Sequence, residues 1–191
     1  MNILHSSRTD KWYTPVWVLD LCRQALGYVA LDPASDLFGN TRVKAARILT
    51  EADDGLTSPW GWSGSPITVF CNPPGGKKGN KSMAGLFWAR LMKERELGRI
   101  RHAIFLAFSA EALQNTQGKG LPAIGEFPCC VPAKRLRFDT PDGEPGAAPS
   151  HSNIIVYVPG TEDHTERFID VFDDVGTILN RTCMRQHLKR G

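Results

Sequence analysis

Apolar positions along the chain fall into short continuous runs and into longer stretches with helical spacing. The continuous runs predict strands at 28–31, 68–71, 103–108 and 152–158. The helical spacing predicts helices at 15–26, 83–97, 110–113 and 165–179, and either a helix or a helix plus a short strand at 40–49. Strands that alternate with helices indicate an α/β fold with a mostly parallel central sheet and helices on both faces.

Turn residues set the expected element ends. Thr14 is predicted to cap the first helix, with Pro15 as its first residue and Gly27 as its end. The N–H groups at this helix start also suit a carboxylate ligand. The basic segment 132–138, the variable loop at about 139–151 and the following apolar run predict a hairpin-like strand pair at the end of the sheet.

The length and composition predict one globular domain over residues 1–191. The basic tail at about 181–191 could be disordered. No apolar run is long enough to span a membrane and the N-terminus lacks a signal-peptide core, so a cytoplasmic location is expected. The five cysteines show no metal-ligand spacing, so no metal site is predicted. The net charge of +3 permits an anionic partner without indicating one.

The sequence Asn72-Pro73-Pro74 follows the run at 68–71 and carries the most distinctive chemistry. A parallel strand delivers its last residue to the carboxyl edge of the sheet, where open α/β sheets bind ligands. Two prolines without N–H groups make this corner stiff and rich in carbonyl acceptors. The Asn72 side-chain oxygen and the Pro73 carbonyl could accept both hydrogens of a nucleobase amino group and aim its lone pair at an electrophile. A strand followed by a plain proline turn is the alternative.

Acidic residues mark two other predicted turns. Asp32 ends the first strand and is followed by Pro33 and Ala34. The carboxyl end of the first strand is where doubly wound sheets bind a nucleotide-like ligand. Asp53 and Asp54 precede a turn glycine. The chain has no G-x-G-x-x-G sequence, which argues against a nicotinamide dinucleotide.

Basic residues form two candidate contacts to DNA phosphates. The first is a glycine-rich loop with Lys77, Lys78 and Lys81, in which Asn80 takes the place of the second glycine of a phosphate-loop pattern. The second is the cluster of Lys134, Arg135 and Arg137. A solvated loop and a charged edge strand are equally good explanations.

Taken together and in order, these motifs resemble the phage-type DNA adenine-N6 methyltransferases. The resemblance is carried by 12–15 (Trp-Tyr-Thr-Pro), 31–34 (Leu-Asp-Pro-Ala), 53–56 (Asp-Asp-Gly-Leu), Trp60 and 72–75 (Asn-Pro-Pro-Gly). It implies a Rossmann-like methyltransferase fold, S-adenosylmethionine as methyl donor with S-adenosylhomocysteine as product, and adenine in DNA as acceptor. One departure is Gly75, because many relatives have there an aromatic residue that stacks on the extruded base.

The resemblance also implies roles for individual residues. Asn72, Pro73 and Pro74 are the catalytic candidates. The candidates for cofactor binding are Tyr13, Thr14, Pro15, Asp32, Pro33, Ala34, Asp53 and Asp54. Among them Asp32 suits the cofactor's ammonium group and Asp54 its adenine amino group, while Asp36 and Glu51 both remain candidates for the ribose.

Other functions remain open on the sequence. The same Asn-Pro-Pro chemistry serves methyltransferases that act on cytosine N4 or on a glutamine side chain. A DNA-binding protein with a decayed catalytic site is a third class, favoured by Gly75. A methyltransferase acting on a base in DNA is expected to flip that base out of the duplex. Because no separate target-recognition domain is evident, we expect short or relaxed sequence specificity.

Overall fold

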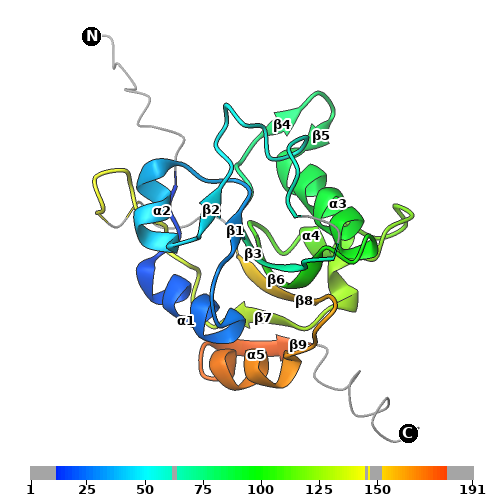
Figure 1. The fold of residues 1–191 in the computed structure, drawn as a ribbon. Helices are drawn as coiled ribbons and strands as arrows, with labels where there is room; N and C mark the ends of the chain where they lie inside the picture. The colour runs from blue at the N-terminus through cyan, green and yellow to red at the C-terminus, as the bar shows by residue number, and fades with distance from the viewer. Residues whose placement is uncertain (1–11, 62–63, 145, 147–151, 180–191) are drawn as a thin grey trace, which may run out of the picture.

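The structure is a computed structural model, and it describes residues 12–61, 64–144, 146 and 152–179. A seven-stranded sheet with the strand order β2-β1-β3-β6-β8-β7-β9 runs through its centre (Figure 1). The strands of this sheet are β1 (Leu31–Asp32), β2 (Arg47–Ile48), β3 (Ile67–Cys71), β6 (Ile100–Ala107), β7 (Cys129–Pro132), β8 (Ile154–Pro159) and β9 (Gly176–Leu179). A separate two-stranded hairpin consists of β4 (Lys77–Lys78) and β5 (Lys81–Ser82).

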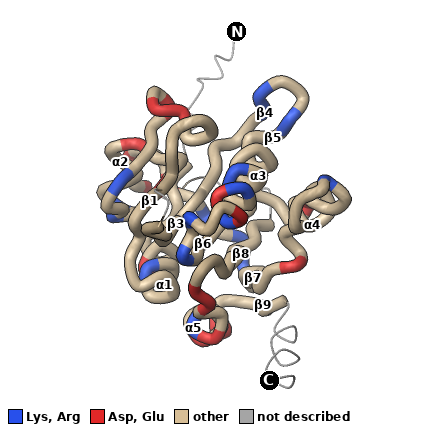
Figure 2. The backbone as a smooth tube through the Cα atoms, turned by 45° about the vertical axis from the view of Figure 1, so that its right-hand side comes forward, with Lys and Arg blue, Asp and Glu red and all other residues tan. Residues whose placement is uncertain are grey.

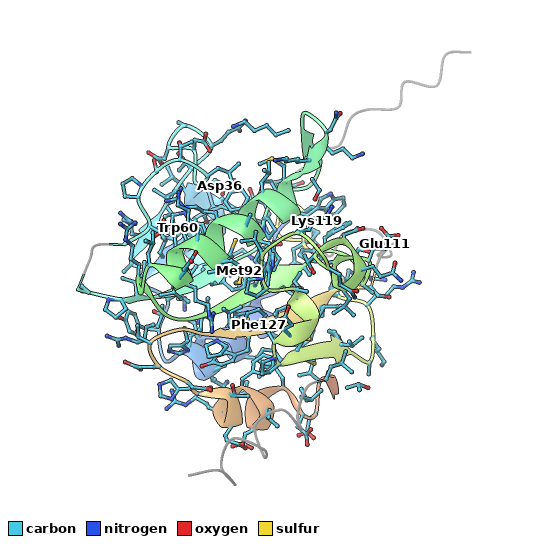
Figure 3. All side chains as sticks on the ribbon, turned by 90° about the vertical axis from the view of Figure 1, so that its right-hand side faces the viewer. Asp36, Trp60, Met92, Glu111, Lys119 and Phe127 are labelled. Atoms are coloured by element: carbon cyan, nitrogen blue, oxygen red, sulfur yellow. The ribbon has the colours of Figure 1, made fainter. Side chains whose placement is uncertain are left out.

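The helices pack on both faces of the sheet. They are α1 (Val16–Leu26), α2 (Leu37–Val43), α3 (Met83–Glu96), α4 (Ala112–Asn115) and α5 (Thr165–Phe172), with a 3₁₀ turn at Ile124–Glu126. On one face, α1 and α5 cover Phe70 and its neighbours. On the other, α3 covers Val69 and Cys71, and Figure 3 shows Met92 and Trp60 on this side. The alternation of β3 side chains between the two cores makes it an interior strand.

Strand directions divide the sheet into two halves. Strands β2, β1, β3 and β6 pair in parallel, so their carboxyl ends meet at one edge. Beyond β6 every pairing is antiparallel: β8 pairs with β6, β7 with β8, and β9 with β7. Since β7 therefore runs in the direction of β6, five of the seven strands point the same way. The prediction of an α/β fold with a mostly parallel sheet is confirmed.

The central elements match the sequence predictions closely. The predicted strands at 68–71 and 103–108 are β3 and β6, and the predicted helix at 83–97 is α3. The ambiguous stretch at 40–49 contains the end of α2 and all of β2. The first strand begins later than predicted, because the described backbone pairs as a strand only at Leu31–Asp32.

Two predicted boundaries were wrong at helix ends. Helix α1 begins at Val16 with Pro15 as its N-cap and without a side-chain cap, and the Thr14 hydroxyl accepts a hydrogen bond from Asn72. The predicted helix at 165–179 ends at Phe172, and 176–179 forms strand β9 instead. A Cβ atom at Gly176 would lie 2.0 Å from the Val131 carbonyl oxygen. Strand β9 therefore lies so close to β7 at this position that only glycine fits.

The strand before the variable loop was also placed wrongly. It is Cys129–Pro132, and 133–138 continues as irregular chain in which Leu136 and Phe138 are buried. The glycine-rich loop forms the hairpin β4–β5. The tail at 181–191 and most of the loop at 145–151 lie outside the described residues. Among those that are described, no helix has both the length and the apolar character needed to cross a membrane.

Candidate active site

Asn72 follows β3 directly and contacts a segment far away in the sequence. Its side-chain Nδ2 donates a hydrogen bond of 3.1 Å to the Thr14 hydroxyl oxygen. Thr14 is buried just ahead of α1. Because the amide nitrogen is engaged with Thr14, the Asn72 oxygen Oδ1 is left as an acceptor with no donor among the described residues.

The two prolines after Asn72 differ in exposure. Pro73 is buried and Pro74 is exposed. Gly75 is exposed as well, and a side chain built there would meet nothing within 4 Å. The corner is therefore fixed at Pro73 and opens toward solvent beyond it. A Cβ atom at position 75 would therefore meet no obstacle, so close packing does not require glycine there.

Asp32 is a carboxyl group held inside the protein at the end of β1. It is 3% exposed, and its Oδ1 accepts a 3.1 Å hydrogen bond from the Ala34 N–H. Burial raises the pKa of Asp32 to about 7, although the bonds from Ala34 and Ser35 oppose the shift. An acid in such a position titrates near neutral pH, which is typical of functional sites.

Tyr13 and Asp36 connect the segment before α1 to the turn after β1. The Tyr13 hydroxyl donates to Asp36 Oδ2 at 2.8 Å, and Asp36 Oδ1 accepts the Gly39 N–H at 2.7 Å. Burial and this bond raise the pKa of Tyr13 to about 12. Asp36 thus caps α2, which makes it the less accessible of the two ribose candidates, while Glu51 is exposed.

The acidic turn at 53–54 lies against the turn that follows β1. A side chain at Gly55 would approach the Pro33 carbonyl oxygen to 1.9 Å, so only glycine allows this contact. The Asp53 carboxylate accepts from the N–H and hydroxyl of Thr50 at 2.8 and 2.7 Å. The Asp54 carboxylate accepts from the Leu56 N–H at 3.0 Å, and this bond lowers the pKa of Asp54. Asp53 is exposed and Asp54 is half-buried, and the second Asp54 oxygen, Oδ2, lies 3.5 Å from the Lys78 ammonium nitrogen.

The three lysines of the glycine-rich segment lie on the hairpin β4–β5. Lys77 pairs with Ser82 and Lys78 with Lys81, and Gly79 begins the two-residue loop with a φ of +61°. A positive φ at this position is typical of a type II′ turn. Figure 2 shows the hairpin projecting from the body with basic residues on both strands. The Lys78–Asp54 pair connects it to the acidic turn.

The second basic cluster is exposed at Lys134, Arg135 and Arg137. Arg137 lines an open depression of about 400 Å³ beside the start of α1. The other lining residues are Pro15, Val16, Trp17, Arg42, Asp139 and Gly143. This depression does not include Asn72 or Asp32.

Arg42 is a site residue that the sequence did not reveal. Its guanidinium donates to the Asp139 carboxylate and, at 3.4 Å, to the Thr14 carbonyl oxygen. These partners are 97 and 28 positions away in the chain, so no local pattern could signal them. Arg42 holds the segment that carries Thr14 beside the segment that carries Asp139.

The contacts bring most of the predicted residues to one edge of the sheet. Thr14 meets Asn72, Tyr13 meets Asp36, the turn after Asp54 meets Pro33, and Lys78 meets Asp54. Asp32 and Asn72 end neighbouring parallel strands, since Leu31 is in register with Val69. Lys134 and Arg135 lie elsewhere in the chain, in the irregular segment that follows β7.

Comparison of the chain with protein-family models, with curated proteins and with solved structures gave no match in any of the three.

Proposed function

We propose that the chain is an S-adenosylmethionine-dependent methyltransferase that acts on the N6 amino group of adenine in DNA. The observation that carries this proposal is the hydrogen bond between Asn72 and Thr14 at the carboxyl end of β3. It orients the amide so that Oδ1 remains an acceptor, next to a proline corner whose carbonyls have no competing N–H neighbours. The strand order, with β8 antiparallel between β6 and β7, is consistent with a Rossmann-like methyltransferase fold.

The chemistry needs acceptors rather than a strong base. Asn72 Oδ1 and the Pro73 carbonyl would accept the two hydrogens of the adenine amino group and direct its lone pair toward the methyl group. The cofactor supplies an electrophilic sulfonium methyl group. The nitrogen forms the new bond, the sulfur keeps the electron pair of the broken one, and the nitrogen then releases one proton to water. Pre-set acceptors favour this step because they already face the charge that develops on nitrogen.

The donor and acceptor groups at this edge fit the cofactor. Asp32 is a buried acid that would face the ammonium group, and Asp54 has a carboxylate oxygen for the adenine amino group. The N–H groups at the start of α1, an 11-residue helix, suit the carboxylate, with Arg137 adding positive charge to the depression beside them. Glu51 is the more open ribose candidate, because both oxygens of Asp36 are engaged.

DNA would approach along the exposed basic hairpin. Lys77 and Lys81 project from a small rigid unit next to the acidic turn, where they can contact phosphates without reading sequence. The cluster Lys134, Arg135 and Arg137 is the second candidate contact. Since none of these groups is part of a separate recognition domain, we expect short or relaxed sequence specificity.

The direct experiment is nucleoside analysis of DNA after incubation with the purified protein and methyl-labelled S-adenosylmethionine. The proposal expects label in N6-methyladenine. Label in N4-methylcytosine would show that cytosine is the acceptor instead of adenine. Label on added protein but not on DNA would favour a glutamine acceptor. Calorimetry with the cofactor separates these outcomes from the third class, because a protein that only binds DNA has no reason to bind S-adenosylmethionine.

A further inference from the structure

Two histidines and a glutamate meet on the side of the molecule away from Asn72. His102 lies near the start of β6, in register with Thr68, and Asn72 lies four positions further along β3 toward its carboxyl end. Glu162 and His164 belong to the turn between β8 and α5. One ligand atom from each of the three side chains lies within 4.8 Å of the others. His164 Nε2 and Glu162 Oε2 are 3.0 Å apart, and the two imidazole rings are 4.9 Å apart at their centroids.

His102 has an unusual environment for a polar side chain. It is 2% exposed, and its Nδ1 is buried without a hydrogen-bond partner among the described residues. Buried polar atoms are nearly always paired, so an imidazole nitrogen that has no partner within the described part of the chain, in a ring beside two further ligand groups, is a candidate for binding an ion. Burial, followed by the neighbouring His164, lowers the pKa of His102 to about 4.

The turn that carries the other two groups is held firmly. The Glu162 N–H donates to the Arg101 carbonyl oxygen at 3.0 Å, and the His164 N–H donates to the Tyr157 hydroxyl at 2.7 Å. A side chain at Gly160 would meet the Ile100 carbonyl oxygen at 2.0 Å, so the turn is packed tightly on β6. Contacts of this kind orient ligand side chains before an ion arrives.

The surrounding charges set the strength of such a site. Glu162 Oε1 lies 3.2 Å from Arg101 Nε, so one carboxylate oxygen is shared with a guanidinium while the other faces His164. Arg167 adds a second positive charge near His102. These cations oppose a metal ion, and three protein ligands leave at least one position to water. We therefore expect a lower metal affinity than that of a closed structural site with four protein ligands.

We propose that His102, Glu162 and His164 form a binding site for a divalent transition metal ion, of which Zn²⁺ best suits two imidazoles and one carboxylate. The ion would join β6, through His102, to the turn before α5, through Glu162 and His164. It lies apart from Asn72, so the site does not depend on the proposed methyl transfer.

The test uses the full chain after treatment with a chelator and its removal. Zn²⁺ is titrated by calorimetry, and Co²⁺ binding is followed through its visible absorption. The wild type is expected to bind one Zn²⁺ per chain at this site and to gain thermal stability from it. Glu162→Gln and His164→Ala are each expected to weaken Zn²⁺ binding at least about tenfold and to change the Co²⁺ spectrum.

The variants are chosen so that folding does not confuse the result. Glu162 and His164 are exposed by 45% and 36% at the side chain, so their replacement leaves the core intact, and circular dichroism checks this. Glu96→Gln at the end of α3 is the control with the same charge change as Glu162→Gln and should bind like the wild type, as should Asn72→Ala. The proposal is overturned if the wild type binds no Zn²⁺, or if the variant carrying both Glu162→Gln and His164→Ala binds it as tightly as the wild type does.

Discussion

The parallel and antiparallel halves of the sheet differ in where the carboxyl ends of their strands lie. In the parallel half, β1 and β3 deliver Asp32 and Asn72 to one edge, and the loops that gather there touch one another. In the antiparallel half, successive strands end at opposite edges, so β8, β7 and β9 do not all deliver their last residues to one edge. Parallel topology is what turns residues far apart in the sequence into a candidate site. The predictions below separate the two halves.

The largest expected effect comes from adding a methyl group at a glycine in each half. Gly55→Ala and Gly176→Ala place a Cβ at 1.9 and 2.0 Å from a backbone oxygen, so each must displace main chain. Each is expected to destabilise the protein by about 1–3 kcal/mol, visible as a lower Tm. Only Gly55→Ala should also abolish cofactor binding by the folded fraction, as calorimetry measures. Equal loss of binding in both variants would contradict a site confined to the parallel half.

The second prediction concerns pH. With its pKa near 7, Asp32 is protonated below neutrality and ionised above it. If it binds the cofactor's ammonium, the affinity should rise with pH and level off above about 7, falling about tenfold for each unit below. In the same window, from the ordinary pKa of Asp near 4 up to about 7, stability should decrease as pH rises, since the folded state holds the proton more tightly.

Asp32→Asn provides the control for that profile. The amide does not titrate, so both the affinity and this part of the stability should become independent of pH across the neutral range, and the affinity should stay at the weak level of the protonated acid. An unchanged profile in Asp32→Asn would assign the titration to another group.

A third variant tests the orientation of Asn72. Thr14→Val keeps the shape of the buried side chain and removes the hydroxyl that accepts from Asn72 Nδ2. Turnover is expected to fall about tenfold, the cost of one hydrogen bond, because the amide loses its fixed orientation. Thr14→Ser retains the hydroxyl and should restore most of the activity. Equal loss in both variants would indicate a packing effect.

The smallest effect is expected at the hairpin. Replacing Lys77 and Lys81 by Ala should weaken DNA binding severalfold, and the slope of its salt dependence should fall by about one for each phosphate that is no longer neutralised. The pair Lys93 and Lys119 is the control with the same charge change, since Lys93 lies on α3 and Lys119 in the loop after α4 (Figure 3). If both pairs act alike, the hairpin does not bind DNA specifically.

An element could be predicted from the sequence where a local apolar or helical pattern defines it. Strand β3 and helix α3 have unbroken apolar or helical patterns, so their positions could be predicted, and with them the place of Asn72. The sequence predicts helix at the position of β9 because Val175 and Leu179 continue the spacing of α5. The pairing of β9 with β7 depends on a distant segment. The hairpin β4–β5 has exposed lysines and two-residue strands, which leave no apolar pattern to detect.

Within the candidate site, residue types could be predicted and contacts could not. The sequence marked Thr14 as a helix cap, and it does not show that the hydroxyl is taken by Asn72, 58 positions away. The titration of Asp32 near neutral pH depends on burial that only the assembled sheet provides. No sequence motif joins the three side chains of the proposed metal site, because His102 is far in sequence from Glu162 and His164.

The central claim is that Asn72 holds the acceptor amine at the carboxyl end of β3. Single-turnover transfer of labelled methyl groups to DNA by Asn72→Ala tests it most directly, with Asn115→Ala as a control on an exposed asparagine. We predict a rate at least about a hundredfold below wild type, with the fold and cofactor affinity retained. A wild-type rate in Asn72→Ala would contradict the account.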